Sequence, residues 1–165
     1  FNLAHRMRLA LLRQTQSSPL FLRMLAQNAL SVAPPLGRIR DFVTDADPEH
    51  PGTIDLKKYG VRLFTDAARV FALARQVEAT NTVSRLKRGG ALLNMSGEEI
   101  SASVDAFNFI QFLRLRHQHF EQEQGRAGDN LIRPDELNEV ERRILIESFR
   151  QARKLQARLR LDYQL

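Results

Sequence analysis

The chain has 165 residues and a formal net charge of +6 at pH 7, and 43% of its residues are hydrophobic. This length fits one domain, and the ordinary apolar content argues against intrinsic disorder. The sequence has no apolar run of about 18 residues, which argues against a membrane span. It also has no cysteine, which excludes disulfides and thiolate metal sites and fits a reducing compartment such as the cytoplasm.

Arginine dominates the basic residues, with 21 Arg against 4 Lys. A guanidinium group can bind a phosphate or carboxylate through two hydrogen bonds, so the excess fits a phosphate-binding role. A genomic composition bias would produce the same excess without any function. The positive charges form no run of five or more, so the sequence does not predict a nucleic-acid-binding tail.

The spacing of apolar residues predicts an all-α fold, an antiparallel helical bundle with room for one small β-hairpin near residues 38–58. In chain order, we expect helices over residues 1–14, from Pro19 to just before Pro34, from about Asp66 to Val77, and over about 82–93, 97–124 and 138 onward. The hairpin would pair residues 39–43 with residues 53–57 across a connector rich in turn formers.

The long helix over about 97–124 is apolar nearly all round between Ile100 and Leu115. Such a helix is expected to be central and surrounded by other elements. Ser96 and Glu99 have the spacing of a capping box, which marks where this helix begins. The last helix carries one apolar stripe, made of Val140, Leu145, Phe149, Ala152, Leu155 and Leu159.

A dense group of charges lies where a short strand, a glycine turn and a helix are expected to follow one another. Its members are Asp55, Lys57, Lys58, Arg62, Asp66 and Arg69. Junctions of this kind can bring backbone amides and charged side chains together around an anionic ligand. The alternative is an edge strand protected by lysines, followed by a capped helix.

A second polar group lies near the end of the long helix and consists of Arg114, Arg116, His117 and Gln118. Three of these side chains fall within one helical turn and point in neighbouring directions. They could form a polar pocket for a substrate. Alternatively, they could form a structural network between helices, with Asp66 or Asp105 as partners, because buried polar groups are costly unless they are paired.

Catalytic signatures are missing from the sequence. Nucleotidyl transfer requires carboxylates that hold Mg²⁺ and a cradle for the triphosphate, yet no Gly-Ser dipeptide occurs, and Asp45 and Asp47 stand in a turn-rich loop. His117 and His119 point about 200° apart on a helix, so they cannot share a metal ion. We therefore expect no catalytic residue and no metal site in this chain.

Nine short segments occur in one order between about residues 18 and 163. They are Pro19-Leu-Phe-Leu-Arg23 with Leu25-Ala26, Pro35-Leu-Gly37, Gly52-Thr-Ile-Asp-Leu-Lys57, Asp66-Ala-Ala-Arg69 with Ala72-Leu73-Ala74, Thr80-Asn-Thr82 with Arg85-Leu86, Asp105-Ala-Phe107, Leu113-Arg-Leu-Arg-His-Gln118, Asp129-Asn130, and Pro134-Asp-Glu-Leu137 with Glu141-Arg142. In this order they resemble the nucleotidyltransferase substrate-binding domain family. That family is the helical C-terminal part of bacterial signalling proteins that also carry CBS or cyclic-nucleotide-binding modules and a nucleotidyltransferase domain.

The segment Asp55-Leu-Lys-x-x-Gly60-x-Arg62 is also similar to the one that follows the catalytic domain in PII uridylyltransferases and glutamine synthetase adenylyltransferases. Those enzymes usually carry a glycine pair followed by Arg-Asp or Arg-Glu. Here Tyr59 occupies the first glycine position and Leu63 the acidic position.

The resemblance implies that residues 15–165 form a helical substrate-binding domain, and that residues 1–14 form a lead-in helix from an upstream nucleotidyltransferase domain. Since the first residue is Phe1 and not Met, we expect the chain to be cut from a longer protein. The domain would complete the catalytic cleft and position the substrate with the two charged groups described above.

The implied substrate is a PII-like regulatory protein, and the missing catalytic domain would use Mg²⁺ and a nucleoside triphosphate. This chain alone would hold no cofactor and would not catalyse transfer, and we expect neither a nucleic acid nor a membrane as its partner. The alternative is an interaction module that links sensor domains or forms a homodimer. An exposed apolar patch on the first helix would favour that alternative, whereas a cleft lined by Lys57, Arg62, Arg69 and Arg116 would favour substrate binding.

Overall fold

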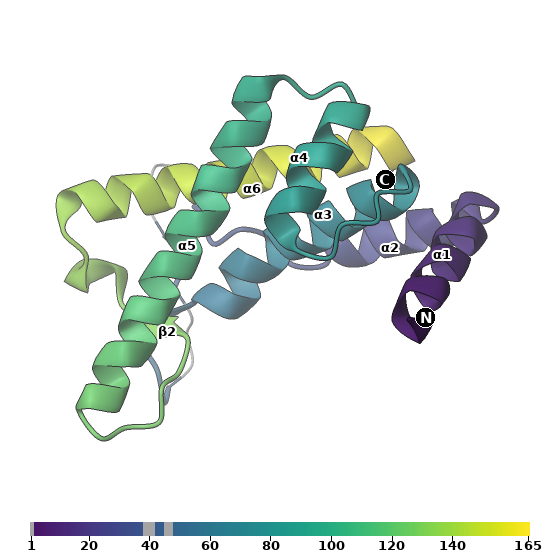
Figure 1. The fold of residues 1–165 in the computed structure, drawn as a ribbon. Coiled ribbons are helices and arrows are strands. Elements are labelled where there is room, and N and C mark those ends of the chain that lie inside the picture. The colour runs from purple at the N-terminus through teal and green to yellow at the C-terminus, as the bar shows by residue number, and fades with distance from the viewer. Residues whose placement is uncertain (1, 38–41, 45–47) are drawn as a thin grey trace. The chain divides into compact units, whose positions relative to one another are not determined.

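A computed structural model describes residues 2–37, 42–44 and 48–165 of the chain, and its elements are predominantly helical (Figure 1). The α-helices within these ranges are α1 (Leu3–Gln16), α2 (Pro19–Ala29), α3 (Arg62–Ala74), α4 (Thr82–Leu92), α5 (Gly97–Glu123) and α6 (Glu139–Tyr163). The short elements are the strands β1 (Ile54–Asp55) and β2 (Leu131–Ile132), the π-helical turn η1 (Lys57–Val61) and the 3-10 turn η2 (Pro134–Glu136). The predicted all-α fold is confirmed.

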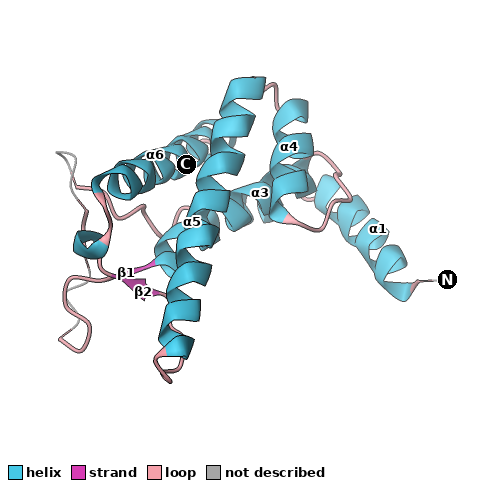
Figure 2. Ribbon diagram, turned by 60° about the vertical axis from the view of Figure 1, so that its left-hand side comes forward, coloured by secondary structure: helices cyan, strands magenta, loops and turns pink. Residues whose placement is uncertain are grey.

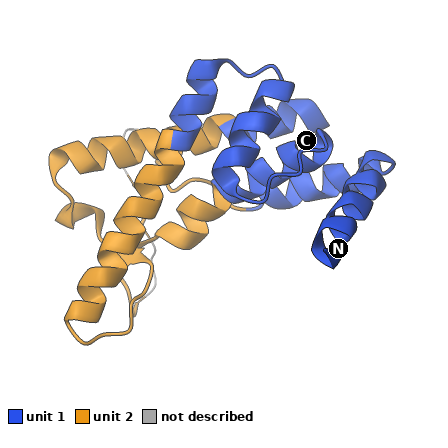
Figure 3. Cartoon of the chain, viewed as in Figure 1, with its two compact units in different colours: residues 1–31, 64–104, 155–165 blue, residues 32–63, 105–154 orange. Residues whose placement is uncertain are grey.

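The chain forms two compact units (Figure 3). Unit 1 comprises residues 1–31, 64–104 and 155–165, and unit 2 comprises residues 32–63 and 105–154. Helices α3, α5 and α6 each contribute residues to both units. None of the helices in the described ranges combines the length and the apolar character needed to cross a membrane.

Several helices begin where local sequence signals predict. Asn81 Oδ1 accepts a hydrogen bond of 2.8 Å from a backbone amide in the first turn of α4. Ser96 and Glu99 bond each other's backbone amides at 3.1 and 2.7 Å and open α5. Asn138 and Glu141 form the same reciprocal arrangement at the start of α6, at 2.9 and 3.4 Å. These caps satisfy amides that have no partner inside their helices.

Unit 1 is held together by close helix contacts and by side chains that bond exposed helix ends. Gly89 of α4 approaches α3 so closely that a Cβ atom there would stand 2.9 Å from the Phe71 Cβ. The buried Gln156 donates from Nε2 to the carbonyl of Ala29, the last residue of α2, at 3.1 Å. Since the last carbonyls of a helix lack intrahelical partners, this bond stabilises the end of α2.

Unit 2 contains the small antiparallel sheet (Figure 2). Ile54 lies opposite Ile132, and both are buried, while Asp55 lies opposite Leu131 and both are half-exposed. This alternation is typical of a strand pair with one face on the core. The same unit buries large apolar side chains from η1's flank, α5 and α6, namely Leu56, Ile110, Leu113, Leu145 and Phe149.

The predicted strand over residues 53–57 has a different partner from the one expected. Residues 131–132 pair with it. Of the expected partner, residues 39–41 lie outside the described residues, and Phe42 forms an isolated antiparallel bridge with Leu36. The observed pairing buries two isoleucines against each other, a gain that a local turn signal cannot reveal.

The helix predicted from about Asp66 begins earlier, and Gly60 lies in a helical segment instead of the predicted glycine turn between a strand and a helix. Residues 57–61 form a π-helical turn that runs directly into α3, and Gly60 is buried within it. A Cβ on Gly60 would stand 2.7 Å from the Cγ2 of Ile110 on α5. The glycine is therefore needed for close approach of η1 to α5 within unit 2.

Helix α5 is less completely covered than its sequence predicts. Its residues Ile110 and Leu113 are buried, but Phe112 is 54% exposed and Leu115 is 59% exposed. The stripe of α6 is confirmed from Leu145 onward, whereas Val140 is 65% exposed. Because α5 is apolar on nearly every side, its sequence did not indicate which of its faces stays exposed.

Gly60→Ala should lower the free energy of unfolding by about 1–3 kcal/mol, because the branched side chain of Ile110 is fully buried and cannot move away from a new methyl group. The measurement is a urea titration of the whole chain. The control is Gly97→Ala, where a Cβ would meet nothing within 4 Å; it should be neutral or stabilising by up to about 1 kcal/mol. Equal effects of the two changes would contradict the close contact.

Candidate functional site

The structure divides the predicted site residues between the two units. Unit 2 holds eight of them, namely Asp55, Lys57, Lys58, Arg62, Arg114, Arg116, His117 and Gln118. Asp66 and Arg69 belong to unit 1, where they form an ion pair of 3.0 Å with each other. The candidate site is therefore described in unit 2.

Asp55 acts as a cap for the turn that follows it. Its Oδ1 accepts hydrogen bonds from the backbone amides of Lys57 and Lys58, both at 2.9 Å. An aspartate in this position accepts hydrogen bonds from amides at the start of a helix, and its negative charge interacts favourably with the positive end of the helix dipole. The carboxylate is therefore committed to the backbone, and its role is to position the two lysines.

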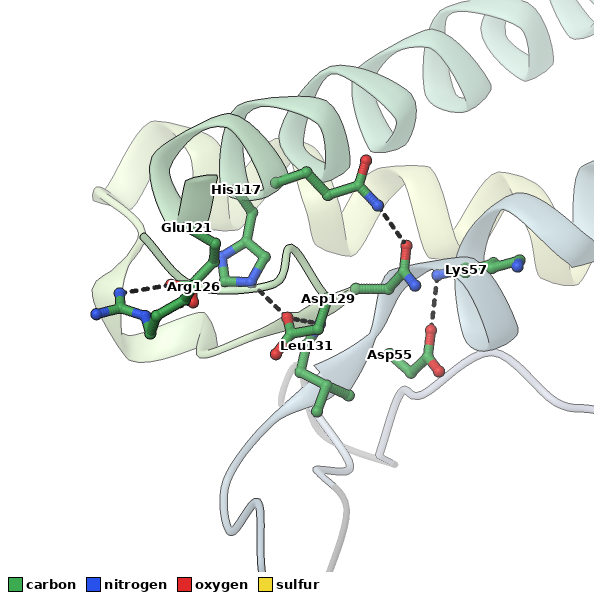
Figure 4. Close-up of polar contacts among 9 residues, drawn as sticks. Asp55, Lys57, His117, Glu121, Arg126, Asp129 and Leu131 are labelled. Atoms are coloured by element: carbon green, nitrogen blue, oxygen red, sulfur yellow. Dashed lines mark hydrogen bonds and ion pairs between the residues drawn. The ribbon is translucent and has the colours of Figure 1, made fainter. Parts of the chain in front are cut away.

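Both lysines are exposed on this capped turn. The Lys58 ammonium lies 4.7 Å from the centroid of the Tyr59 ring, within cation–π range. Figure 4 shows the Lys57 side chain extending away from the Asp55 carboxylate, and it forms no ion pair with the described residues. The turn thus exposes positive charge on a backbone that is held by the Asp55 carboxylate.

The loop that returns from α5 is tied to the end of that helix. His117 Nε2 lies 2.6 Å from Asp129 Oδ1, and the same oxygen accepts the backbone N–H of Leu131 at 2.9 Å. Gln118 Nε2 donates to Asn130 Oδ1 at 3.1 Å. These contacts fix residues 129–131 at the point where β2 begins (Figure 4).

Asn130 joins the two groups that the sequence marked separately. Its side chain accepts from Gln118 of α5, and its backbone carbonyl accepts the N–H of Leu56 at 2.9 Å. The lysine-bearing turn and the end of α5 are therefore two parts of one hydrogen-bonded assembly within unit 2.

The partners of the α5 polar group differ from the predicted ones. We expected Asp66 or Asp105, but His117 pairs with Asp129 and Gln118 with Asn130, and Asp105 is exposed. The reason is that the chain reverses after α5 and brings residues 129–130 back alongside it. The structural-network interpretation of this group is thus supported for these two side chains.

Arg114 is engaged within α5, since its Nη1 donates to Gln111 Oε1 at 2.6 Å. Its Nε is buried and has no hydrogen-bond partner among the described residues.

Arg116 is also engaged. It forms an ion pair and hydrogen bond with Glu141 of α6, and its guanidinium lies 5.4 Å from the centroid of the Phe112 ring. The hydrogen bond from Arg116 lowers the pKa of the Glu141 carboxyl below its usual value, and the same bond raises the pKa of Arg116. This pair holds α5 and α6 together within unit 2.

Glu121 and Arg126 close the loop after α5 with a two-point ion pair, at 2.6 and 2.8 Å. The hydrogen bond from Arg126 lowers the pKa of Glu121. Both side chains contact solvent, so this pair orders the loop but adds little to stability.

The residues predicted to line one cleft are divided between the units, with Arg69 in unit 1 and Lys57, Arg62 and Arg116 in unit 2. One pocket of unit 2 is lined by Arg116 and His117 together with apolar side chains. Among the described residues, no group of His, Asp and Glu side chains has the arrangement of a metal site.

Sequence reasoning did not select Asp129 and Asn130 as site residues, although both were part of the family resemblance. Their role depends on partners in α5 and next to β1 that are remote in sequence. The available signal was an Asp-Asn pair directly before two apolar residues at a turn.

Comparison with protein-family models identifies the family of this chain. Residues 19–163 match the model of the family described as "Putative nucleotidyltransferase substrate binding domain". No curated protein and no solved structure matches the chain. The matched range includes every residue of the candidate site and begins after α1.

We predict that Glu141→Gln reduces stability in a pH-dependent way. The pKa of Glu141 is lowered in the folded chain, so its ion pair stabilises the fold fully above the ordinary glutamate pKa of about 4.3. That contribution is lost as the pH falls through the lowered pKa. Urea titrations should therefore show the largest difference between the native chain and the variant near neutral pH, and a smaller one in acid.

The control for this measurement is Glu139→Gln, which removes a carboxylate from the same turn of α6. Among the described residues, Glu139 forms no ion pair, so its replacement should give a smaller difference at neutral pH. An Arg116–Glu141 contribution that persists unchanged in acid would contradict the assignment.

Proposed function

Because the chain belongs to the nucleotidyltransferase substrate-binding domain family, we propose that it binds the acceptor substrate of a linked nucleotidyltransferase region and positions it for transfer. The family description supports a role in substrate binding. The sequence supports the placement of catalysis in the linked region, because no Gly-Ser cradle occurs in the chain. Transfer itself would take place on the linked region, with Mg²⁺ and a nucleoside triphosphate bound there.

The observation that carries this proposal is the Asn130 junction in unit 2. It joins the exposed lysine turn to the end of α5, so that Lys57 and Lys58 stand on a backbone that is fixed by hydrogen bonds. A fixed pair of cations next to a small sheet is suited to an acidic protein surface, because a preorganised contact loses little side-chain and backbone freedom on binding.

The acceptor that we propose is a regulatory protein of the PII type. The support is the likeness of Asp55-Leu-Lys-x-x-Gly60-x-Arg62 to the segment that follows the catalytic domain of PII uridylyltransferases. In this proposal the transferred group is a nucleotidyl moiety, and CBS or cyclic-nucleotide-binding modules of the same protein would regulate the transfer.

The linked nucleotidyltransferase region is proposed to pack on one face of α1. Leu3, Met7 and Leu11 lie at i, i+4 and i+8, and they are 71%, 63% and 45% exposed. We call these three residues the α1 stripe. Apolar side chains in such a row mark a protein contact when they are this exposed.

The charge of α1 indicates what kind of surface covers this stripe. The helix carries Arg6, Arg8 and Arg13 and has no acidic residue. A partner with an apolar centre and an acidic rim complements it, whereas a second α1 would bring like charges together. We therefore assign the stripe to the linked nucleotidyltransferase region.

A second candidate function, a dimerisation module, is favoured by one observation, the exposed α1 stripe itself. The two candidates differ in the oligomeric state that they predict for this chain. If the stripe binds the nucleotidyltransferase region, the isolated chain is a monomer. If the stripe binds a second copy, the chain is a dimer.

The substrate-binding role predicts that Lys57→Glu weakens binding of a PII-type protein to the full-length enzyme. We expect a loss of about 1 kcal/mol, roughly fivefold, from one exposed charge contact at low salt. The loss should shrink at high salt because screening weakens exposed charges. Stability of the isolated chain should stay within about ±0.5 kcal/mol.

The matched control is Lys87→Glu, an exposed lysine on α4 in unit 1. It should leave binding unchanged at every salt concentration. Equal weakening by both variants would show only a general effect of net charge, and unchanged binding in Lys57→Glu would reject the lysine turn as the contact.

The oligomeric state separates the two uses of the α1 stripe. Size-exclusion chromatography with light scattering should give the molar mass of a monomer for the native sequence and for Met7→Glu. The control is Leu161→Glu, which changes a residue that is 77% exposed at the far end of the chain. A native dimer that Met7→Glu dissociates, and Leu161→Glu does not, would establish dimerisation instead.

A further inference from the structure

A pocket in unit 2 is separate from the lysine turn and is not used by the function proposed above. It has a volume of about 220 Å³. Its apolar lining comes from α5 and from the segment that follows it, through Leu113, Phe120, Ile132 and Leu137. Leu113 and Ile132 are buried, whereas Phe120 is 54% exposed at the mouth. The pocket therefore has a buried apolar floor and an aromatic side chain that a ligand would cover.

Four charged or polar side chains surround this floor, and two of them are already committed. Arg116 pairs with Glu141, and His117 contacts Asp129 at 2.6 Å. Each of the two therefore already has a charged partner within unit 2. These two side chains shape the wall of the pocket.

The other two, Arg133 and Glu136, are exposed and form no side-chain hydrogen bond or ion pair with the described residues. Their backbones are nevertheless fixed, because the Glu136 N–H donates to the Arg133 carbonyl at 3.0 Å across the turn η2. Among the described residues, the pocket thus presents one cation and one carboxylate without a side-chain partner, three positions apart in the chain, above an apolar floor.

We propose that this pocket binds a free amino acid with an apolar side chain. Arg133 would bind the α-carboxylate, Glu136 the α-ammonium group, and the side chain would fill the space between Leu113, Ile132 and Leu137. A ligand with both charges satisfies both rim residues at once, whereas a simple anion would be repelled by Glu136. No other residue of the chain is asked to change its partner.

The size of the pocket agrees with this choice of ligand. Sites for drug-sized molecules and cofactors measure about 300–1,000 Å³, so 220 Å³ is small for a nucleotide. A nucleoside triphosphate would also place several negative charges next to Glu136. In a single amino acid the carboxylate, the ammonium group and the apolar side chain are all attached to one Cα atom. The two charged groups can therefore reach Arg133 and Glu136 while the side chain enters the apolar floor.

Binding at this position would act on the scaffold of the lysine turn. Ile132 belongs to β2 and pairs with Ile54, and His117 holds Asp129 next to the same strand. A ligand that packs on Ile132 would therefore stabilise unit 2, because it binds the folded chain and not the unfolded one. The inference does not depend on the proposed function, because amino-acid binding can be measured without any acceptor protein or nucleotidyltransferase region.

The test is a titration of the whole chain, labelled at its leucine and isoleucine methyl groups, with L-leucine and with L-phenylalanine at up to millimolar concentration. NMR shifts should appear at Leu113, Ile132 and Leu137, and not at Leu86, which is buried in unit 1. N-acetyl-L-leucine and L-leucinamide each lack one of the two charges. Both should bind at least about tenfold more weakly, since each lacks one charge-assisted hydrogen bond.

Two variants locate the charges. Arg133→Gln and Glu136→Gln should each weaken L-leucine binding at least about tenfold. Glu136→Gln should instead strengthen the weak binding of N-acetyl-L-leucine, because it removes the carboxylate that repels an anion without an ammonium group. Arg143→Gln, at an exposed position of α6, is the matched control and should have no effect. The analogue measurements need no variant, so they remain decisive if a substitution unfolds the chain.

Three results would overturn the proposal. The first is the absence of shifts at the pocket methyl groups with either amino acid. The second is binding that neither rim variant weakens. The third is equal binding of N-acetyl-L-leucine and L-leucine, which would show that the ammonium group is not recognised and would point to a peptide segment as the ligand.

Discussion

The pairing of residues 54–56 with residues 130–132 is the constraint on which the rest of unit 2 depends. Two strand residues on each side and one further hydrogen bond, from Leu56 to Asn130, connect the segment before α3 to the segment after α5. The pairing is short, and an isolated pair of this length would not be stable in water. It persists because Ile54 and Ile132 are buried and because His117 and Gln118 hold the returning loop.

Most charges that attracted attention in the sequence serve the scaffold. Asp55 caps a turn, Arg116 binds Glu141, and His117 binds Asp129, so each is committed to a partner inside unit 2. Other charged side chains of unit 2 remain exposed, among them Lys57 on the capped turn and Arg133 and Glu136 at the pocket. Scaffold and binding groups are thus different residues of the same short segments.

The family assignment and the structure address different questions about this chain. The family match over residues 19–163 identifies the kind of domain, and the geometry indicates which surfaces are available for its work. Helix α1 lies before the matched range and has an apolar row open to solvent. The chain therefore exposes basic side chains in unit 2 and an apolar row in unit 1, and the role of each can be tested without the other.

The sequence by itself determined the helices, their caps and the family. Those features depend on residues within a few positions of one another, such as Ser96 with Glu99 or Asn138 with Glu141, so local spacing predicts them. Only the tertiary structure decided the partner of β1, the helical place of Gly60, the partners of His117 and Gln118, and which side of α5 stays exposed. Each of these depends on a contact between residues far apart in the chain, where burial of a specific pair outweighs local preference.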